Sequence, residues 1–324
     1  MAETQYDVLC AGLIVADHVC APIERIPPAG QLEMTDRIDL TIGGCGSNVA
    51  VDLSRLELRA CVAGRVGNDA VGRHVCQALE EEGVACEQVT FSETAQTSTT
   101  MVVNVKGEDR RFIHAAGANA EFTGAEIAAE AIRNSRALYV GGFGLNAALS
   151  GENVAALFEV ARGAGVLTVL DVVVGDEDVD AMLRPVLPVT DLFLPNNDEA
   201  HQITGLTDPI QQAERFRSLG AECVVITCGD EGSVLVAGES TLRASAHRVE
   251  QVDPTGGGDA FVAGFLYGRL SGCGPNECLR FGAALGASCV QSRGATTGVF
   301  RRAELEEFVR ENPLAPTARN RGGV

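Results

Sequence analysis

The sequence of 324 residues contains a single lysine, Lys106, no tryptophan, and no apolar run long enough to cross a membrane. Because no Gly-Lys-Ser or Gly-Lys-Thr triplet occurs, a Walker A loop is excluded. Lys106 itself lies in a segment typical of a hairpin turn, which argues against Schiff-base chemistry there. Any phosphate that this protein handles must therefore be bound without a lysine.

Charge narrows the classes of partner. The chain carries 44 acidic and 25 basic residues, a formal net charge of −19. A surface this acidic disfavours nucleic acids and anionic membranes. The amino-terminal segment also lacks the basic region and apolar stretch of a secretory signal. We therefore expect a cytoplasmic protein with small-molecule partners, and neither nucleic acid nor membrane among them.

The cysteines lack a paired pattern. Their number, 11, is odd, no Cys-x-x-Cys occurs, and several lie among apolar residues. This usage predicts buried, reduced thiols rather than disulfides or a zinc site.

Short apolar runs alternate with amphipathic stretches along the chain. The runs predict strands at 6–14, 137–141, 167–173, 191–194, 223–227 and 233–236. The amphipathic stretches predict helices at 48–56, 71–82, 152–164, 209–219, 259–270, 275–291 and 302–311. Strands that are apolar on both faces and separated by helices indicate an α/β fold with a doubly wound, mostly parallel sheet.

Two regions of the chain show a different, strand-like pattern. Segments 97–105 and 110–114 alternate like the two strands of an antiparallel hairpin. With 32–42 they predict a small protruding β-sheet that acts as a lid. We expect one domain over 1–311, with lid strands from about 15–42 and 97–115, and a disordered tail at 312–324. Because exposed sheet edges often pair, a homodimer through the lid is also expected.

The most informative motif is three glycines, Gly256, Gly257 and Gly258, followed by Asp259 and an amphipathic stretch. Consecutive glycine amides at a helix N-terminus can converge on one anion, and the helix dipole adds positive potential. A carboxylate there would repel a phosphate unless it removed a proton from the group attacking that phosphate. The alternative is an ordinary N-terminal cap at Asp259, and the motif alone leaves both open.

Two further motifs are individually weak. Gly43 and Gly44 allow close backbone approach to a ligand, and Asn48 offers a donor and an acceptor. Asn196 and Glu199 lie one helical turn apart and are oxygen donors suited to Mg²⁺-bound water. Each pattern is equally typical of a capped helix start.

The combination and order of these motifs resemble the ribokinase-like (PfkB) family of carbohydrate kinases. Matches also occur at 16–18, 64–69, 114–119 and 292–295, so the resemblance covers about 6–311. It implies one doubly wound α/β domain with a β-lid over the acceptor site. It further implies ATP as the phosphate donor and Mg²⁺ as cofactor.

The resemblance also implies roles for individual residues. Asp259 would be the general base, and the amides of Gly256, Gly257 and Gly258 would form the anion hole. The acceptor hydroxyls would be held by Asp17, Gly43, Gly44 and Asn48. The nucleotide would be bound by Asn196, Thr227, Gly229 and Gly294, and Glu199 would hold Mg²⁺ through water. A monovalent cation such as K⁺ would lie at Asp253 and Thr255, although Gly298 stands where a serine often sits.

Departures from the ribokinase pattern bear on the acceptor. Cys45 replaces a lysine, and a glutamate is missing near Gly142. Losing a carboxylate that binds a polyol costs about a few kcal/mol, which disfavours ribose. Arg111 and His114 on the lid could contact a carboxylate or stack on a base.

The sequence thus predicts an ATP-dependent phosphotransferase acting on a hydroxymethyl group of a sugar or sugar acid. A nucleoside kinase of the same fold is the alternative. A catalytically silent ligand sensor is a third possibility, against which the retained Asp259 and glycines argue.

Overall fold

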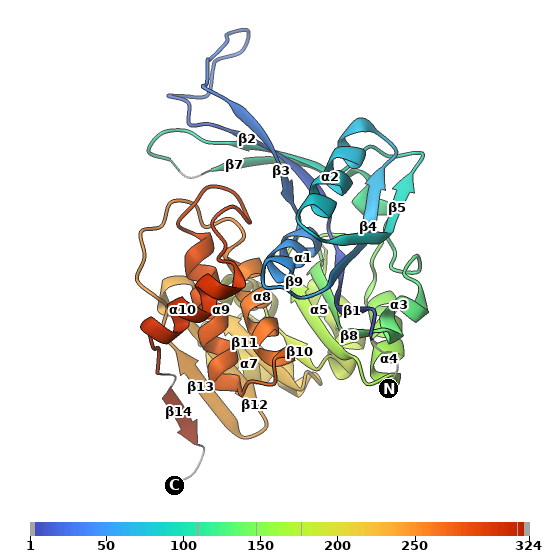
Figure 1. Ribbon diagram of the computed structural model, residues 1–324, viewed down its shortest axis with the longest axis vertical. Coiled ribbons are helices and arrows are strands. Elements are labelled where there is room, and N and C mark those ends of the chain that lie inside the picture. The colour runs from blue at the N-terminus through green and yellow to red at the C-terminus, as the bar shows by residue number, and fades with distance from the viewer. Residues whose placement is uncertain (1–3, 109, 147, 176, 316, 321–324) are drawn as a thin grey trace.

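A ten-stranded β-sheet forms the centre of the protein in the computed structural model, which describes residues 4–320 except 109, 147, 176 and 316 (Figure 1). In spatial order its strands are β14 (Thr317–Asn320), β13 (Ser240–Ala244), β12 (Ser233–Ala237), β11 (Cys223–Thr227), β10 (Leu192–Phe193), β9 (Leu167–Val172), β8 (Ser135–Phe143), β1 (Tyr6–Gly12), β4 (Ala60–Gly67) and β5 (Ala85–Ser92). Strands from β11 to β5 pair in parallel, whereas β11 to β14 form an antiparallel run at the other edge.

Helices cover both faces of this sheet, as the apolar strands require. One apolar core includes residues of α1 (Cys45–Arg55), α2 (Ala70–Glu81), α8 (Gly257–Leu270), α9 (Pro275–Cys289) and α10 (Arg302–Glu311). The core on the opposite face includes residues of α3 (Ala129–Arg133), α4 (Gly151–Gly163), α5 (Val179–Val186), α6 (Asn197–Thr204) and α7 (Pro209–Ser218). Alternate residues of one strand enter different cores, for example Val8 and Leu9 of β1.

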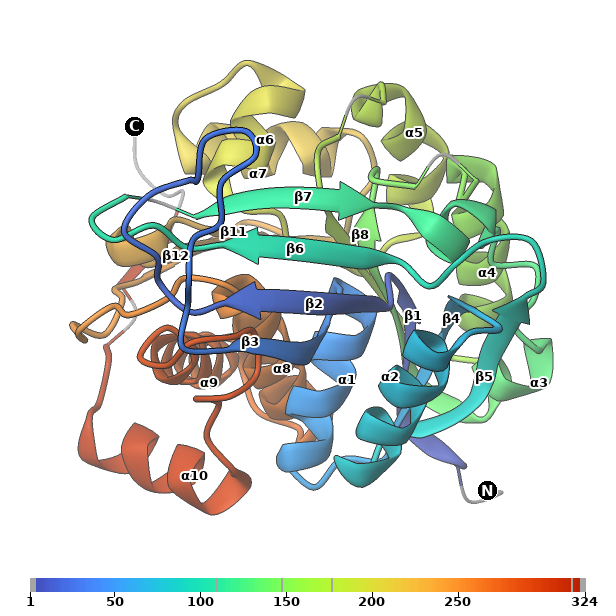
Figure 2. The same cartoon turned by 90° about the horizontal axis from the view of Figure 1, so that it is seen from above.

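A separate four-stranded sheet forms the lid. Its order is β3 (Ile38–Gly43), β2 (Val15–Cys20), β6 (Thr99–Val103) and β7 (Arg111–Ala115). Only two residues separate β1 from β2, so the lid starts at the carboxyl end of a central strand. Figure 2, which looks down on Figure 1 from above, shows the lid strands lying across the body.

The order of strands locates the functional region. From β1 the chain first adds β4 and β5 on one side, and later adds β8 to β11 on the other. Such a reversal creates a crevice at the carboxyl ends of the strands, where ligands bind in open α/β sheets. The end of β1 therefore marks where the lid, the neighbouring strand ends and a bound ligand meet.

The predicted fold class is confirmed, with one correction at the carboxyl end. Residues 312–324 were expected to be disordered, yet Thr317–Asn320 form β14 and pair antiparallel with β13. A short polar segment can gain order by completing the hydrogen bonds of a sheet edge, which its lack of apolar periodicity does not reveal. Among the described residues, no helix is long and apolar enough to cross a membrane.

Candidate active site

The lid presents a polar row toward the body. Asp17 of β2, Thr100 of β6 and His114 of β7 lie directly opposite one another in the sheet, so their side chains share one face. The Thr100 hydroxyl and His114 Nδ1 are 3.0 Å apart. Burial raises the pKa of Asp17 to about 6, although a hydrogen bond from Thr100 opposes the shift. A side chain at Gly43 would collide with the Asp17 carboxylate, which explains the glycine.

Arg111 lies on the opposite face from this row. Neighbouring strand residues alternate in direction, so Arg111 shares the outer face of the lid with Met101 and Ile113. Its guanidinium forms an ion pair with Glu108, and both side chains are about half exposed. The structure therefore brings His114, but not Arg111, to the side of Asp17.

Asp259 lies in the first turn of α8, where two side chains from α1 hold its carboxylate. Asn48 Nδ2 donates to Asp259 Oδ2 at 2.8 Å, and the Cys45 thiol hydrogen-bonds to the same group. Burial raises the pKa of Asp259, and these two hydrogen bonds limit the rise. The N-cap of α8 is Gly256 rather than Asp259, which excludes the ordinary capping interpretation. Asn48, expected to bind the acceptor, thus also orients this carboxylate.

The three glycines before Asp259 differ in whether the structure could accommodate a side chain. Gly256 has a φ of 77°, and a side chain there would collide with the carbonyl of Ala295. A Cβ at Gly258 would face open space. The Gly257 amide donates to the Pro254 carbonyl at 3.2 Å, while those of Gly256 and Gly258 have no backbone partner among the described residues. Two of the three predicted donors are therefore available to an anion.

A carboxylate that the sequence analysis missed completes this region. Asp171 near the end of β9 has an oxygen within 4.8 Å of ligand atoms of Cys45 and Asp259. The Tyr139 hydroxyl donates to Asp171 Oδ2 at 3.2 Å. Burial and the nearby carboxylates of Glu199 and Asp259 raise the pKa of Asp171 well above its usual range. Its position near the carboxyl end of a buried parallel strand was the available signal.

Asn196 and Glu199 form a capping box at the start of α6. Glu199 donates its amide to Asn196 Oδ1 at 2.8 Å, and the Asn196 amide donates to Glu199 Oε2 at 2.9 Å. The capping interpretation is thus correct for both residues. Burial nevertheless raises the pKa of Glu199 to about 7, with a contribution from Asp259. The Glu199 carboxylate therefore also interacts with Asp171 and Asp259, and these three residues form an acidic cluster.

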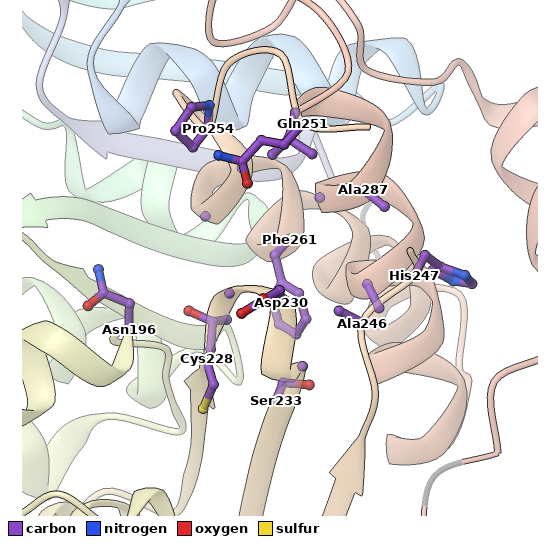
Figure 3. A pocket seen from close by; sticks show the side chains of 18 of the residues that line it. Asn196, Cys228, Asp230, Ser233, Ala246, His247, Gln251, Pro254, Phe261 and Ala287 are labelled. Carbon is purple, nitrogen blue, oxygen red and sulfur yellow. The ribbon is translucent and has the colours of Figure 1, made fainter. Parts of the chain in front are cut away.

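A cavity of about 730 Å³ opens beside α8 (Figure 3). Asn196, Thr227 and Gly229 line it, as do Gly257 and Gly258. In Figure 3, Asn196 stands on one side, Ala246 and His247 on the other, and Phe261 of α8 lies between them. The volume suits a nucleotide-sized ligand.

Gly294, the remaining residue predicted to bind the nucleotide, is absent from the lining of this cavity. Its amide instead donates to Asp253 Oδ2 at 3.0 Å. Gly294 therefore supports the loop before α8 rather than the cavity wall.

Asp253 and Thr255 are engaged by an arginine rather than arranged around an open cation site. Arg110 Nη1 donates to Asp253 Oδ1 at 2.5 Å and also to the Thr255 hydroxyl. Arg110 directly precedes β7 and comes from the lid. No local sequence pattern marks Arg110 as a site residue, because its carboxylate partner Asp253 is 143 residues away.

A doubly wound α/β fold, a half-buried carboxylate at a glycine-rich helix start and a nucleotide-sized cavity are together typical of a phosphotransferase without a Walker A loop. The chain matches the pfkB family carbohydrate kinase over residues 5–301. It belongs to this family of ATP-dependent carbohydrate kinases.

Relatives with different substrates resemble the chain to a similar degree. An uncharacterized sugar kinase of Archaeoglobus fulgidus is 30% identical over 77% of this chain and 98% of its own. A nucleoside kinase of Methanothermobacter thermautotrophicus is 27% identical over 90% and 92%. The structure of Arabidopsis thaliana ribokinase complexed with ribose and ATP superposes with a TM-score of 0.84, at 26% identity, over 94% of this chain and 99% of that one.

Proposed function

We propose that this protein transfers the γ-phosphate of ATP to a hydroxymethyl group of a sugar, with Asp259 as general base. The observation that carries the proposal is the position of the Asp259 carboxylate. It is half-buried at the start of α8, is fixed by Asn48 and Cys45, and follows Gly258, which lines the nucleotide-sized cavity. Asn48 lies in the first turn of α1, which directly follows β3 and its last residue Gly43, and Gly43 lies against Asp17 of the lid. Base, donor cavity and acceptor row are thereby adjacent.

The arrangement of these residues supports an in-line transfer of the γ-phosphoryl group from ATP to the acceptor hydroxyl. As the acceptor oxygen forms a bond to the γ-phosphorus, its proton passes to an oxygen of Asp259, and the bond to the leaving ADP oxygen breaks. The amides of Gly256 and Gly258, with the dipole of α8, stabilise negative charge on the transferring group. Holding the carboxylate at two donors keeps it oriented before the acceptor arrives.

Asp171 and Glu199 are the residues that would hold Mg²⁺ and its waters. Both are half-buried carboxylates with a raised pKa, as expected for carboxylates gathered without a counter-ion. When bound, Mg²⁺ neutralises charge on the nucleotide phosphates. The local excess of negative charge fits a divalent cation.

Charge on the inner face of the lid favours a neutral acceptor over a sugar acid. Asp17, with a pKa of about 6, is negative at neutral pH and repels a carboxylate. Partial burial lowers the pKa of His114, which leaves its ring neutral at pH 7. The Asp17 carboxylate and Thr100 hydroxyl can instead hydrogen-bond to sugar hydroxyls.

A nucleoside is the second candidate acceptor, because one aromatic side chain is available to stack on a base. Phe112 of β7 shares the inner face with His114 and is 54% exposed. Its ring also lies 5.4 Å from the Arg110 guanidinium.

ADP formation with a panel of pentoses, hexoses, sugar acids and nucleosides tests the proposal. Turnover with a neutral sugar supports it, and turnover with nucleosides alone supports the second candidate. Tight binding of one acceptor without phosphorylation of any would establish the sensor instead. The Asp17→Asn variant tests whether the Asp17 carboxylate excludes negatively charged acceptors. If it does, the variant should phosphorylate sugar acids better than the parent protein does.

We also propose that the outer face of the lid pairs with a second copy of the chain. Leu40, Met101 and Ile113 lie in one cross-strand row there, with His18 between Leu40 and Met101, and 37%, 53% and 63% of their surface is exposed. Apolar residues in a row on an exposed sheet mark an interaction surface.

A further inference from the structure

The loop before α8 already contains a positive charge supplied by the lid. We propose that Arg110 takes the place of a monovalent cation at Asp253 and Thr255, so that this kinase works without K⁺. The inference rests on the proposed phosphotransfer and assigns Arg110 a positioning role. Three observations support it: the hydrogen bonds that Asp253 already accepts, the thiol that contacts the loop carbonyls, and the connection of this loop to the anion hole.

Both oxygens of the Asp253 carboxylate already accept hydrogen bonds from the protein, so a cation would compete with these donors. Its Oδ1 accepts Arg110 Nη1 at 2.5 Å, the Thr255 amide at 2.9 Å and the Thr255 hydroxyl at 2.6 Å. Its Oδ2 accepts the Gly294 amide at 3.0 Å. The side chains of Arg110 and Asp253 are only 18% and 11% exposed. Although burial acts to raise it, these hydrogen bonds hold the pKa of Asp253 below its usual value, so the pair stays charged.

A thiol of the protein contacts two neighbouring carbonyls. The Cys289 thiol lies 3.3 Å from the carbonyl oxygen of Thr255 and 3.1 Å from that of Ala295, so its single proton can be donated to either oxygen. At Gly298, a Cβ would come within 2.7 Å of the Ser292 Cβ, so a serine ligand does not fit without movement. A monovalent cation would therefore compete with Arg110 for Asp253 and with the Cys289 thiol for these carbonyl oxygens.

The loop that Arg110 binds leads directly into the anion hole, which explains the role of the Arg110 charge. Thr255 directly precedes Gly256, whose left-handed backbone begins α8. By binding both Asp253 and the Thr255 hydroxyl, Arg110 fixes the turn that aims the glycine amides. Arg110 lies on the same side of the hairpin as His114, toward the body. The loop is therefore stiffened and charged when the lid is in the position seen here.

Phosphotransfer in K⁺, Na⁺ and tetramethylammonium chloride at equal ionic strength tests the inference. We expect the parent protein to keep its kcat within about two-fold in all three salts, because general screening is then constant. In tetramethylammonium, Arg110→Ala should lower kcat at least about tenfold. K⁺ or guanidinium should restore part of this loss, and Arg110→Lys should retain much of the parent activity. Arg37→Ala is the matched control, since it breaks an exposed lid pair with Asp39 far from Asp253 in sequence.

Thermal unfolding of the ligand-free proteins gives a second readout. K⁺, compared with tetramethylammonium, should raise the Tm of Arg110→Ala and leave that of the parent and of Arg37→Ala unchanged. A parent protein that requires K⁺, or an Arg110→Ala variant that responds to no cation in either assay, would overturn the inference. If no acceptor is phosphorylated at all, the proposed function fails, while the melting comparison still decides the role of Arg110.

Discussion

The raised pKa of Glu199 should make the Mg²⁺ requirement depend on pH. A proton and a metal-bound water compete for this carboxylate, whose pKa is about 7. At pH 6 such a group is about nine-tenths protonated, so the free Mg²⁺ needed for half-maximal turnover should rise about tenfold above its plateau. Above about pH 8 the requirement should become constant. The assay is ADP formation at saturating acceptor, titrated with free Mg²⁺ at each pH.

Glu199→Gln provides the control for other titrating groups, which include the nucleotide and Asp171. Glutamine can keep the capping-box hydrogen bond to the Asn196 amide, so α6 should still begin correctly. The variant should need more Mg²⁺ at pH 8 than the parent protein, and its requirement should change less between pH 8 and pH 6. Equal pH dependence in the two proteins would refute the reasoning, because Glu199 would then not be the titrating ligand.

Four further substitutions separate stability, donor binding, acceptor binding and assembly. Gly256→Ala should lower the free energy of unfolding by about 2 kcal/mol or more in urea titrations, since φ is positive and Ala295 blocks the side chain. Gly258→Ala should unfold like the parent protein but raise the KM for ATP, because its methyl group would enter the cavity; an unchanged KM would place the phosphates elsewhere. Asp17→Asn should raise the KM for the acceptor more than it lowers kcat. Met101→Glu should convert a dimer into a monomer in light scattering, and a parent protein that is already monomeric would contradict the lid interface.

The fold was largely predictable because its signals are local. Runs such as 167–173 and 223–227 are apolar on both faces, and only a parallel sheet covered by helices buries both. Strands with mixed burial were harder. The partly exposed β5 (Ala85–Ser92) and the antiparallel β13 (Ser240–Ala244) were not predicted, since their pattern depends on which neighbour covers them. β14 escaped prediction for the same reason. The buried β4 (Ala60–Gly67) was missed as well.

The residues of the candidate site also differ in how well the sequence predicts them. Residues in compact motifs, such as Asp259 and Glu199, could be named because glycine spacing and helix starts are visible in sequence. Asp171, Thr100 and Arg110 could not, because each acts through residues that only the folded chain brings near. Arg110 shows the difference most clearly, since its carboxylate partner is 143 positions away. The proposed replacement of a cation at Asp253 and Thr255 by Arg110 rests on this long-range contact.

The kcat of Asp259→Asn tests the central claim most directly. Asparagine keeps the size of the side chain and an oxygen that can accept from Asn48, but it cannot take a proton. Because the substitution removes a half-buried carboxylate with a raised pKa, the variant should unfold at no lower temperature than the parent protein. We predict that kcat falls by about 10² to 10⁴ with little change in the KM for ATP. A folded variant with kcat within about tenfold of the parent would show that Asp259 is not the general base.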